Sequence, residues 1–159
     1  MPRRLCVDME YLLQALGCTS LAQEAFLDLA QGTVIVLSNT DYTLEEQENC
    51  FFLYKSRPAR YRHIPHTSQR ELHQTMLEFA STVEDADRAY LTQILKGKQS
   101  ISRFYAALDE LPAIAKKWQA FHRRHLLERA RHWLAREGII ADNFQVKQET
   151  ASLSTKEGC

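Results

Sequence analysis

The chain has 159 residues, with 20 Lys and Arg against 20 Asp and Glu, and 45% of its residues are hydrophobic. These values are those of an ordinary soluble globular protein, and they exclude a collagen-like rod, a disulfide-stapled mini-protein and a wholly disordered chain. No apolar run approaches the roughly 20 residues of a membrane span, and the N-terminus lacks the pattern of a secretory signal. The four cysteines are scattered without CxxC spacing, which favours a cytoplasmic protein.

The net charge of zero hides an asymmetry between the two halves of the chain. Residues 1–87 hold seven basic and thirteen acidic residues, and the remainder holds thirteen basic and seven acidic residues. Such an asymmetry indicates either a basic surface for an anionic partner or mutual attraction of the two halves within one fold.

The N-terminal part predicts a helix followed by a β-hairpin. Residues 8–16 space their apolar side chains along one helix face, behind an acidic N-cap. Two apolar stretches, 25–30 and 33–38, flank a Gln-Gly pair and predict the hairpin. Successive residues of 34–37 would point to opposite faces of a sheet, and all four are apolar. We therefore expect this second strand to be paired centrally or covered on both sides.

Helices predominate after the hairpin. Capping boxes begin at Thr43 and Ser68, and glycines follow two of the apolar periodic segments. The elements expected are helices over about 44–55, 68–80, 85–96, 100–108 and 112–137, and a strand over 61–64. The last helix is the longest, at about 26 residues.

Polar residues interrupt the apolar face of the long helix, which is expected to pack in the core. His122, His125 and Arg129 lie on the same helical face as Trp118. With Arg103, they indicate either a site for a small ligand or a buried polar cluster that is satisfied within the fold.

Motifs of catalysis are not recognisable in the sequence. His63, His66 and His73 have no Cys or carboxylate at a diagnostic metal-binding spacing, and the Gly-Lys-Gln-Ser stretch at 97–100 lacks the upstream glycine of a phosphate loop. Neither a nucleophile elbow nor a paired-acid motif marks a hydrolase. We therefore predict a protein that is not an enzyme and has no metal, no cofactor and no catalytic residue.

The face of the long helix opposite Trp118 is basic. This face could follow the phosphates of a nucleic acid, or it could simply be solvated. Small and apolar residues that recur every seven positions inside the same arc instead indicate packing on another helix or a second subunit. The candidate nucleic-acid contacts are Lys116, Lys117, Arg123, Arg124 and Arg131, and the candidate self-association residues are Ala120, Leu127 and Leu134.

Four stretches of the chain carry a resemblance to a known family. They are Phe26-Leu-Asp-Leu-Ala-Gln-Gly-Thr-Val, Arg60-Tyr-Arg-His-Ile-Pro with Ser68 to Phe79, Leu95-Lys-Gly-Lys with Arg103-Phe104, and the Pro112 to Ile139 pattern with Trp118 and Trp133. In order and spacing they resemble the bacterial uncharacterised protein family numbered 0158, over about residues 7–140. The resemblance implies a bacterial cytoplasmic domain of that type and transfers no catalytic residue.

Together these patterns predict one α+β domain over residues 1–140. An N-terminal helix and a hairpin, with a third strand, pack with a mostly helical C-terminal half that ends in one long helix. A polar tail over 141–159 is predicted to be disordered. The predicted function is a non-catalytic module for protein interaction or self-association, with an unknown protein or a second copy as partner. The alternative is weak, sequence-independent nucleic-acid binding through the basic face of 112–137, and no membrane partner is expected.

Overall fold

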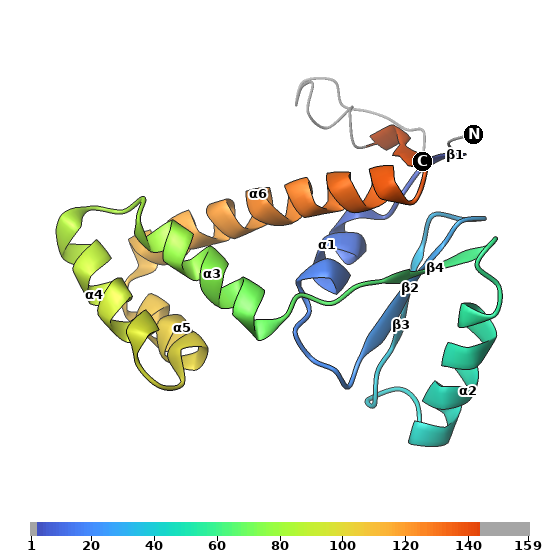
Figure 1. Cartoon of the computed structure of the whole chain (residues 1–159), viewed down its shortest axis with the longest axis horizontal. Helices are drawn as coiled ribbons and strands as arrows, with labels where there is room; N and C mark the ends of the chain where they lie inside the picture. Colours follow the sequence, from blue (N-terminus) through green and yellow to red (C-terminus); the bar gives the residue numbers. More distant parts are fainter. Residues whose placement is uncertain (1–2, 144–159) are drawn as a thin grey trace. The chain divides into compact units, whose positions relative to one another are not determined.

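The structure is a computed structural model that describes residues 3–143, and this range contains six helices and five strands (Figure 1). These elements confirm the predicted α+β class. The described chain divides into a sheet unit, residues 3–66 and 128–143, and a helical unit, residues 67–127. Helix α6 (Pro112–Arg136) contributes residues to both units. The sequence carried no composition shift at these boundaries, and the division was not anticipated.

An antiparallel sheet with the strand order β3–β2–β4 forms the centre of the sheet unit. Its strands are β2 (Glu24–Asp28), β3 (Val34–Leu37) and β4 (Tyr61–Ile64). Residues 25–28 of β2 are buried whichever face they point to, because α1 (Met9–Gly17) and α2 (Leu44–Lys55) lie on opposite sides of the sheet (Figure 1). The hairpin and the third strand are confirmed. Of the two alternatives for the second strand, central pairing was wrong, since β3 is an edge strand and β2 takes the central place. Cover on both sides agrees with the structure, because β3 contacts both α1 and α2.

The hairpin turn packs against the backbone that leads into α1. Gly32 has a φ of +78°, and a Cβ at this position would collide with the carbonyl oxygen of Cys6. The backbone N–H of Asp8 donates to the carbonyl oxygen of Gly32 at 2.9 Å. Only glycine meets both the conformational and the steric requirement of this turn.

An ion pair between the buried Asp28 carboxylate and the exposed Arg60 guanidinium joins the end of β2 to the start of β4. The Asp28 side chain is buried and accepts hydrogen bonds from Nε and Nη2 of Arg60 at 3.2 and 3.1 Å, and from the N–H of Ala30 at 2.8 Å. The hydrogen bond from Arg60 lowers the pKa of the Asp28 carboxyl and outweighs the opposing effect of burial. Asp28 is therefore ionised in the fold and fixes the chain entering β4.

A second, two-stranded sheet brings distant parts of the chain together. Strands β1 (Arg3–Leu5) and β5 (Ile139–Ala141) pair in parallel. Asn143 exchanges two hydrogen bonds with the backbone of Val7. The predicted tail therefore begins too early, because residues 141–143 take part in the fold, and the rest of the predicted tail lies outside the described residues. Three-residue strands are too short to show the alternation that predicts a strand.

Aromatic rings form the centre of the helical unit. It comprises α3 (Gln69–Ala80), α4 (Asp85–Lys96), α5 (Ser100–Glu110) and the first part of α6. The ring of Trp118 lies 5.4 Å from that of Phe79 and 5.2 Å from that of Phe104. Each of α3, α4 and α5 contributes buried residues to this core, as their apolar periodicity predicts.

Candidate functional site

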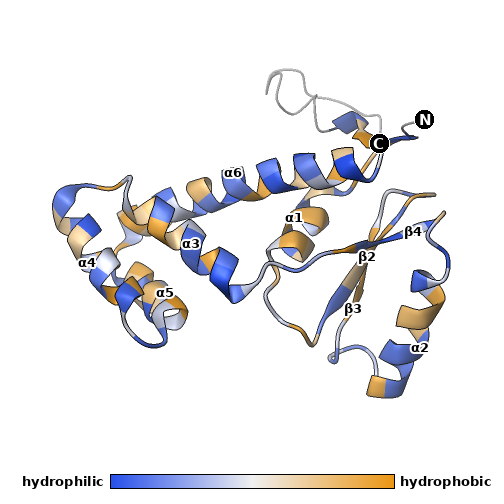
Figure 2. Ribbon diagram, viewed as in Figure 1, coloured by the Kyte–Doolittle hydropathy of each residue, from blue (hydrophilic) through white to orange (hydrophobic). Residues whose placement is uncertain are grey.

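Helix α2 is less buried than the other helices, because none of its residues is buried. It begins at the predicted capping box, in which Thr43 and Glu46 each bond the other's backbone N–H. Phe51 and Tyr54 face the sheet, with their rings 5.6 and 5.4 Å from the ring of Phe26. Burial raises the pKa of the Tyr54 hydroxyl. Apolar residues also stand at the start of α2 and in its last turns (Figure 2), and the sheet covers only part of them.

An open groove of about 460 Å³ runs along α2. Its lining includes Leu21, Leu44 and Phe52, which are 83%, 73% and 71% exposed. These are the three most exposed large hydrophobic residues in the described part of the chain. The groove is therefore an apolar surface that the sheet unit itself leaves uncovered.

Two carboxylates, and no Lys or Arg, line the same groove. Glu24 accepts a hydrogen bond from Nε2 of His63 at 2.7 Å, and the Nε2 atom of His66 lies 3.9 Å from the same carboxylate oxygen. Glu48 is exposed, and its carboxylate has no hydrogen bond or ion pair with any residue in the range 3–143. The groove thus combines apolar walls with negative charge.

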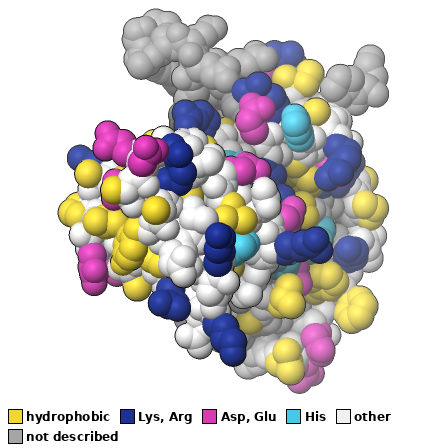
Figure 3. All heavy atoms as spheres, turned by 60° about the vertical axis from the view of Figure 1, so that its left-hand side comes forward, with side chains coloured by type: hydrophobic (Ala, Val, Ile, Leu, Met, Phe, Trp, Pro, Cys, Tyr) yellow, Lys and Arg dark blue, Asp and Glu magenta, His cyan; other side chains and the backbone are white. Residues whose placement is uncertain are grey.

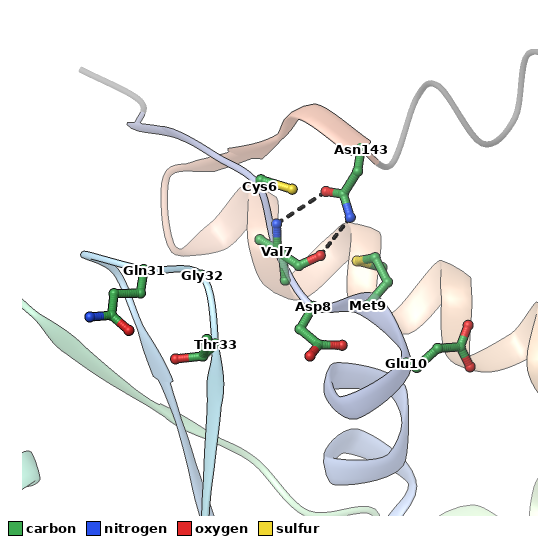
Figure 4. A pocket seen from close by; sticks show the side chains of 9 residues that line it. All are labelled: Cys6, Val7, Asp8, Met9, Glu10, Gln31, Gly32, Thr33 and Asn143. Atoms are coloured by element: carbon green, nitrogen blue, oxygen red, sulfur yellow. Dashed lines mark hydrogen bonds between the residues drawn. The ribbon is translucent and has the colours of Figure 1, made fainter. Parts of the chain in front are cut away.

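A second cavity of about 440 Å³ lies beside the hairpin turn (Figure 4). Two of its polar side chains, Asp8 and Asn143, already serve the fold. The carboxylate of Asp8 accepts from the N–H of Tyr11 at the start of α1, and the Asn143 amide is bonded to the backbone of Val7. We therefore take the α2 groove, whose Glu48 is unpaired, as the candidate site.

The predicted ligand residues of the helical unit lie as follows. Arg103 is exposed on α5 and its guanidinium lies close to Gly97. His122 is half-buried and stacks on Trp118, with ring centroids 4.8 Å apart and an interplanar angle of 11°. Burial is the main cause that lowers the pKa of His122, and the nearby His125 lowers it further. The neutral form of the ring is therefore favoured.

The remaining two ligand candidates have partners in the protein. The Thr75 hydroxyl donates to the carbonyl oxygen of Glu71 at 3.0 Å, and its oxygen lies 3.4 Å from Nε2 of His125. The His125 ring is therefore the donor in that pair. Arg129 donates through Nη2 to the carbonyl oxygen of His66 at 2.8 Å. Both side chains therefore have hydrogen-bond partners within the protein, although the buried Nε atom of Arg129 has none among the described residues.

The basic candidates are on the surface of α6. Lys116, Lys117, Arg123 and Arg124 are exposed in the helical unit. Arg131 lies in the part of α6 that belongs to the sheet unit, where it forms an ion pair with Glu128 at 3.4 Å.

The heptad candidates do not share one exposed stripe. Ala120 is exposed and Leu127 is half-buried, but Leu134 is only 2% exposed. The proposed role of Leu134 in self-association is corrected accordingly, since its side chain is part of the protein core. Its seven-residue spacing from Leu127 reflects packing inside the protein.

The four stretches quoted above correspond to a family model. The Uncharacterised protein family (UPF0158) matches residues 2–156. The chain belongs to this family. No curated protein and no solved structure matches the chain.

Residues 3–143 of this UPF0158 protein contain neither a membrane-spanning helix nor a metal-binding cluster. Every helix in this range is too short or too polar to span a bilayer. In the same range, no three or more His, Cys, Asp or Glu residues are grouped so that they could hold a metal ion.

The groove of this UPF0158 protein was missed from sequence, although a signal for it exists. Residues 51–54 are four consecutive large apolar residues, and on a helix they point in different directions, so one sheet cannot cover them all. Leu21 and Leu44 are isolated apolar residues in polar surroundings, and single surface leucines carry no signal.

Proposed function

We propose that this UPF0158 protein is a non-catalytic protein-interaction module of the bacterial cytoplasm and that the α2 groove is its docking surface. The observation that carries the proposal is the convergence of Leu21, Leu44 and Phe52 on one groove. Scattered exposed apolar residues are ordinary, but a contiguous group marks an interaction surface. Aromatic residues such as Phe52 are enriched in such surfaces.

Burial of the apolar side chains of the groove would supply part of the free energy of binding a partner. Covering a fully exposed Leu or Phe side chain contributes about 1.5–3 kcal/mol. Three such side chains offset part of the cost of association, which is at least about 4 kcal/mol. The packing of Phe51 and Tyr54 on Phe26 holds the helix that carries Leu44 and Phe52 against the sheet before binding.

Site-specific photo-crosslinking in the native cells tests the docking surface. A photoreactive phenylalanine analogue replaces Phe52 in one variant and Tyr90 in the control, because Tyr90 is an exposed aromatic residue of α4. We expect a protein adduct of defined mass from position 52 and none from position 90. Adding Leu44→Asp to the first variant should abolish the adduct.

The crosslinking result can also contradict the proposal. Absence of an adduct at position 52 would overturn it, as would an adduct that Leu44→Asp leaves unchanged. Equal adducts from positions 52 and 90 would show unspecific contact and would count against the groove.

A second candidate function is sequence-independent nucleic-acid binding, favoured by the exposure of Lys116, Lys117, Arg123 and Arg124 on one helix. We rank it below protein interaction. On the face drawn in Figure 3, Lys and Arg side chains stand singly among acidic and apolar ones and form no continuous patch. Binding of this kind would be driven by the neutralisation of phosphates.

The salt dependence of duplex binding tests this second candidate. With four phosphate contacts, the slope of log K against log salt should be about −3.6, and Arg123→Ala with Arg124→Ala should flatten it by about two units. Fluorescence anisotropy on a labelled duplex measures both. No binding at low salt, or a slope that the double variant does not change, would remove nucleic acid as a partner.

A further inference from the structure

We infer that the partner of the α2 groove is a basic, amphipathic protein segment that places a Lys or Arg side chain beside Glu48 and apolar side chains on Phe52. The inference rests on the proposed function and adds the chemistry of the partner. Helices with one apolar and one basic face are the segments that meet both requirements.

The charge of the groove selects a cationic partner. Residues 5–54 contain eight acidic residues and no Lys or Arg, and the groove is lined by residues from this stretch alone. Glu24 already has His63 as a hydrogen-bond donor, but Glu48 has no partner among the residues described. A neutral or acidic segment would cover Glu48 without compensating the loss of water, whereas a Lys or Arg would pair with it.

The aromatic lining suits the same side chains. The Lys55 ammonium lies over the Phe51 ring, 5.6 Å from its centroid, so one ring at the groove already contacts a cation. The neighbouring Phe52 ring, 6.4 Å away, is 71% exposed and can accept a second cation on its face. The methylene stem of a Lys or Arg would cover Phe52 while its charged end reaches Glu48.

The same charges disfavour an identical groove as the occupant. A two-fold contact of α2 with α2 of a second copy would bring Glu48 near the same residue of that copy, with Glu45 and Glu46 close by. Like charges across an interface are unfavourable. A different, basic segment avoids this repulsion.

A pair of designed peptides tests the inference on the full-length protein. Both are fluorescein-labelled helices with leucines on one face. The other face carries arginine residues in the arginine peptide and glutamate residues in the matched glutamate peptide. Fluorescence anisotropy should detect binding of the arginine peptide and at least about tenfold weaker binding of the glutamate peptide, the loss expected when charges on both sides are alike. Binding of the arginine peptide should weaken at high salt.

Substitutions in the groove then locate the binding site. Phe52→Ala should weaken the arginine peptide by about 30-fold, the loss of a central aromatic anchor. Glu48→Gln should weaken it about twofold to fivefold, and Glu48→Lys should reverse the preference between the peptides. Glu78→Lys, on the exposed side of α3, is the matched control and should change neither affinity. Circular dichroism confirms that each variant is folded.

Each result decides the inference. Equal binding of both peptides, binding of neither, or a preference that Glu48→Lys leaves unchanged would overturn it. If these results accompany a specific adduct at position 52, the docking surface stands and only the partner's charge is wrong. An adduct with the mass of two chains would indicate a second copy as the occupant.

Discussion

The helical unit and the α2 side of the sheet unit use their apolar residues differently. In α3, α4 and α5, apolar side chains repeat on one face, and that face is buried around Phe79, Phe104 and Trp118. Helix α2 has as many large apolar residues for its length, yet none is buried, and Leu44 and Phe52 are mostly exposed. The difference separates residues that hold the fold together from residues available to a partner.

Trp118→Ala should give the largest effect, because it removes the ring that both Phe79 and Phe104 contact. We expect the free energy of unfolding to fall by about 3–5 kcal/mol through formation of a cavity. Urea titration followed by circular dichroism measures this change. A loss under about 1 kcal/mol would mean that Trp118 is not a core residue.

Asp28→Asn should have the next largest effect, because Arg60 and the N–H of Ala30 would lose a charged acceptor. The expected loss of stability at neutral pH is about 1–3 kcal/mol.

The pH dependence of this loss follows from the direction of the pKa shift. The Asp28 pKa lies below 3.8 in the folded chain, so on acidification the unfolded chain binds the proton first. The contribution of Asp28 is complete well above pH 3.8 and is lost as the pH falls toward the folded pKa. Urea titrations of both proteins across this range should therefore converge. A constant difference down to low pH would contradict the account.

His122→Phe should have a smaller, pH-dependent effect. The His122 pKa lies below 6.5 in the folded chain, so as the pH falls through 6.5 the unfolded chain binds the proton first and stability decreases. Phenylalanine keeps the stacking on Trp118 and removes this decrease, which we expect to be below about 1 kcal/mol because water screens a half-exposed ring. Thermal melts of both proteins above and below pH 6.5 measure the difference. Parallel pH profiles would show that His122 is not the group responsible.

Phe52→Ala should have the smallest effect on stability, although Phe52 is a large aromatic residue. Its ring is 71% exposed, so we expect a change within about 0.5 kcal/mol by urea titration. Comparing its loss of stability with that of Trp118→Ala tests most directly whether the groove residues are available to a partner while the core residues hold the fold together. A loss above about 2 kcal/mol would place Phe52 in the core and remove it from the docking surface.

Much of the fold could be predicted from local signals. The capping boxes at Thr43 and Ser68 fix where α2 and α3 begin, and apolar periodicity sets the buried faces of the helical unit. Features that depend on the pairing of segments far apart in the sequence were not predicted. Strands β1 and β5 exist because residues at opposite ends of the described chain meet, and β3 is an edge because β4 joins the other side of β2.

The functional site was less predictable than the fold. Polar residues on the α6 stripe stood out in the sequence, but His125 and Arg129 have partners within the protein. The groove draws on two separate segments, around Leu21 and along α2, and only the folded chain brings them together. Its charge could have been read from the absence of Lys and Arg over residues 5–54.

Hydrogen–deuterium exchange with and without the arginine peptide tests the central claim most directly, because it shows where on the chain a partner binds. The account predicts slower exchange over α2 and the residues around Leu21, with α5 unchanged. Protection over residues 112–127, or none over α2 at a peptide concentration that saturates binding, would contradict the assignment of the groove as the docking surface.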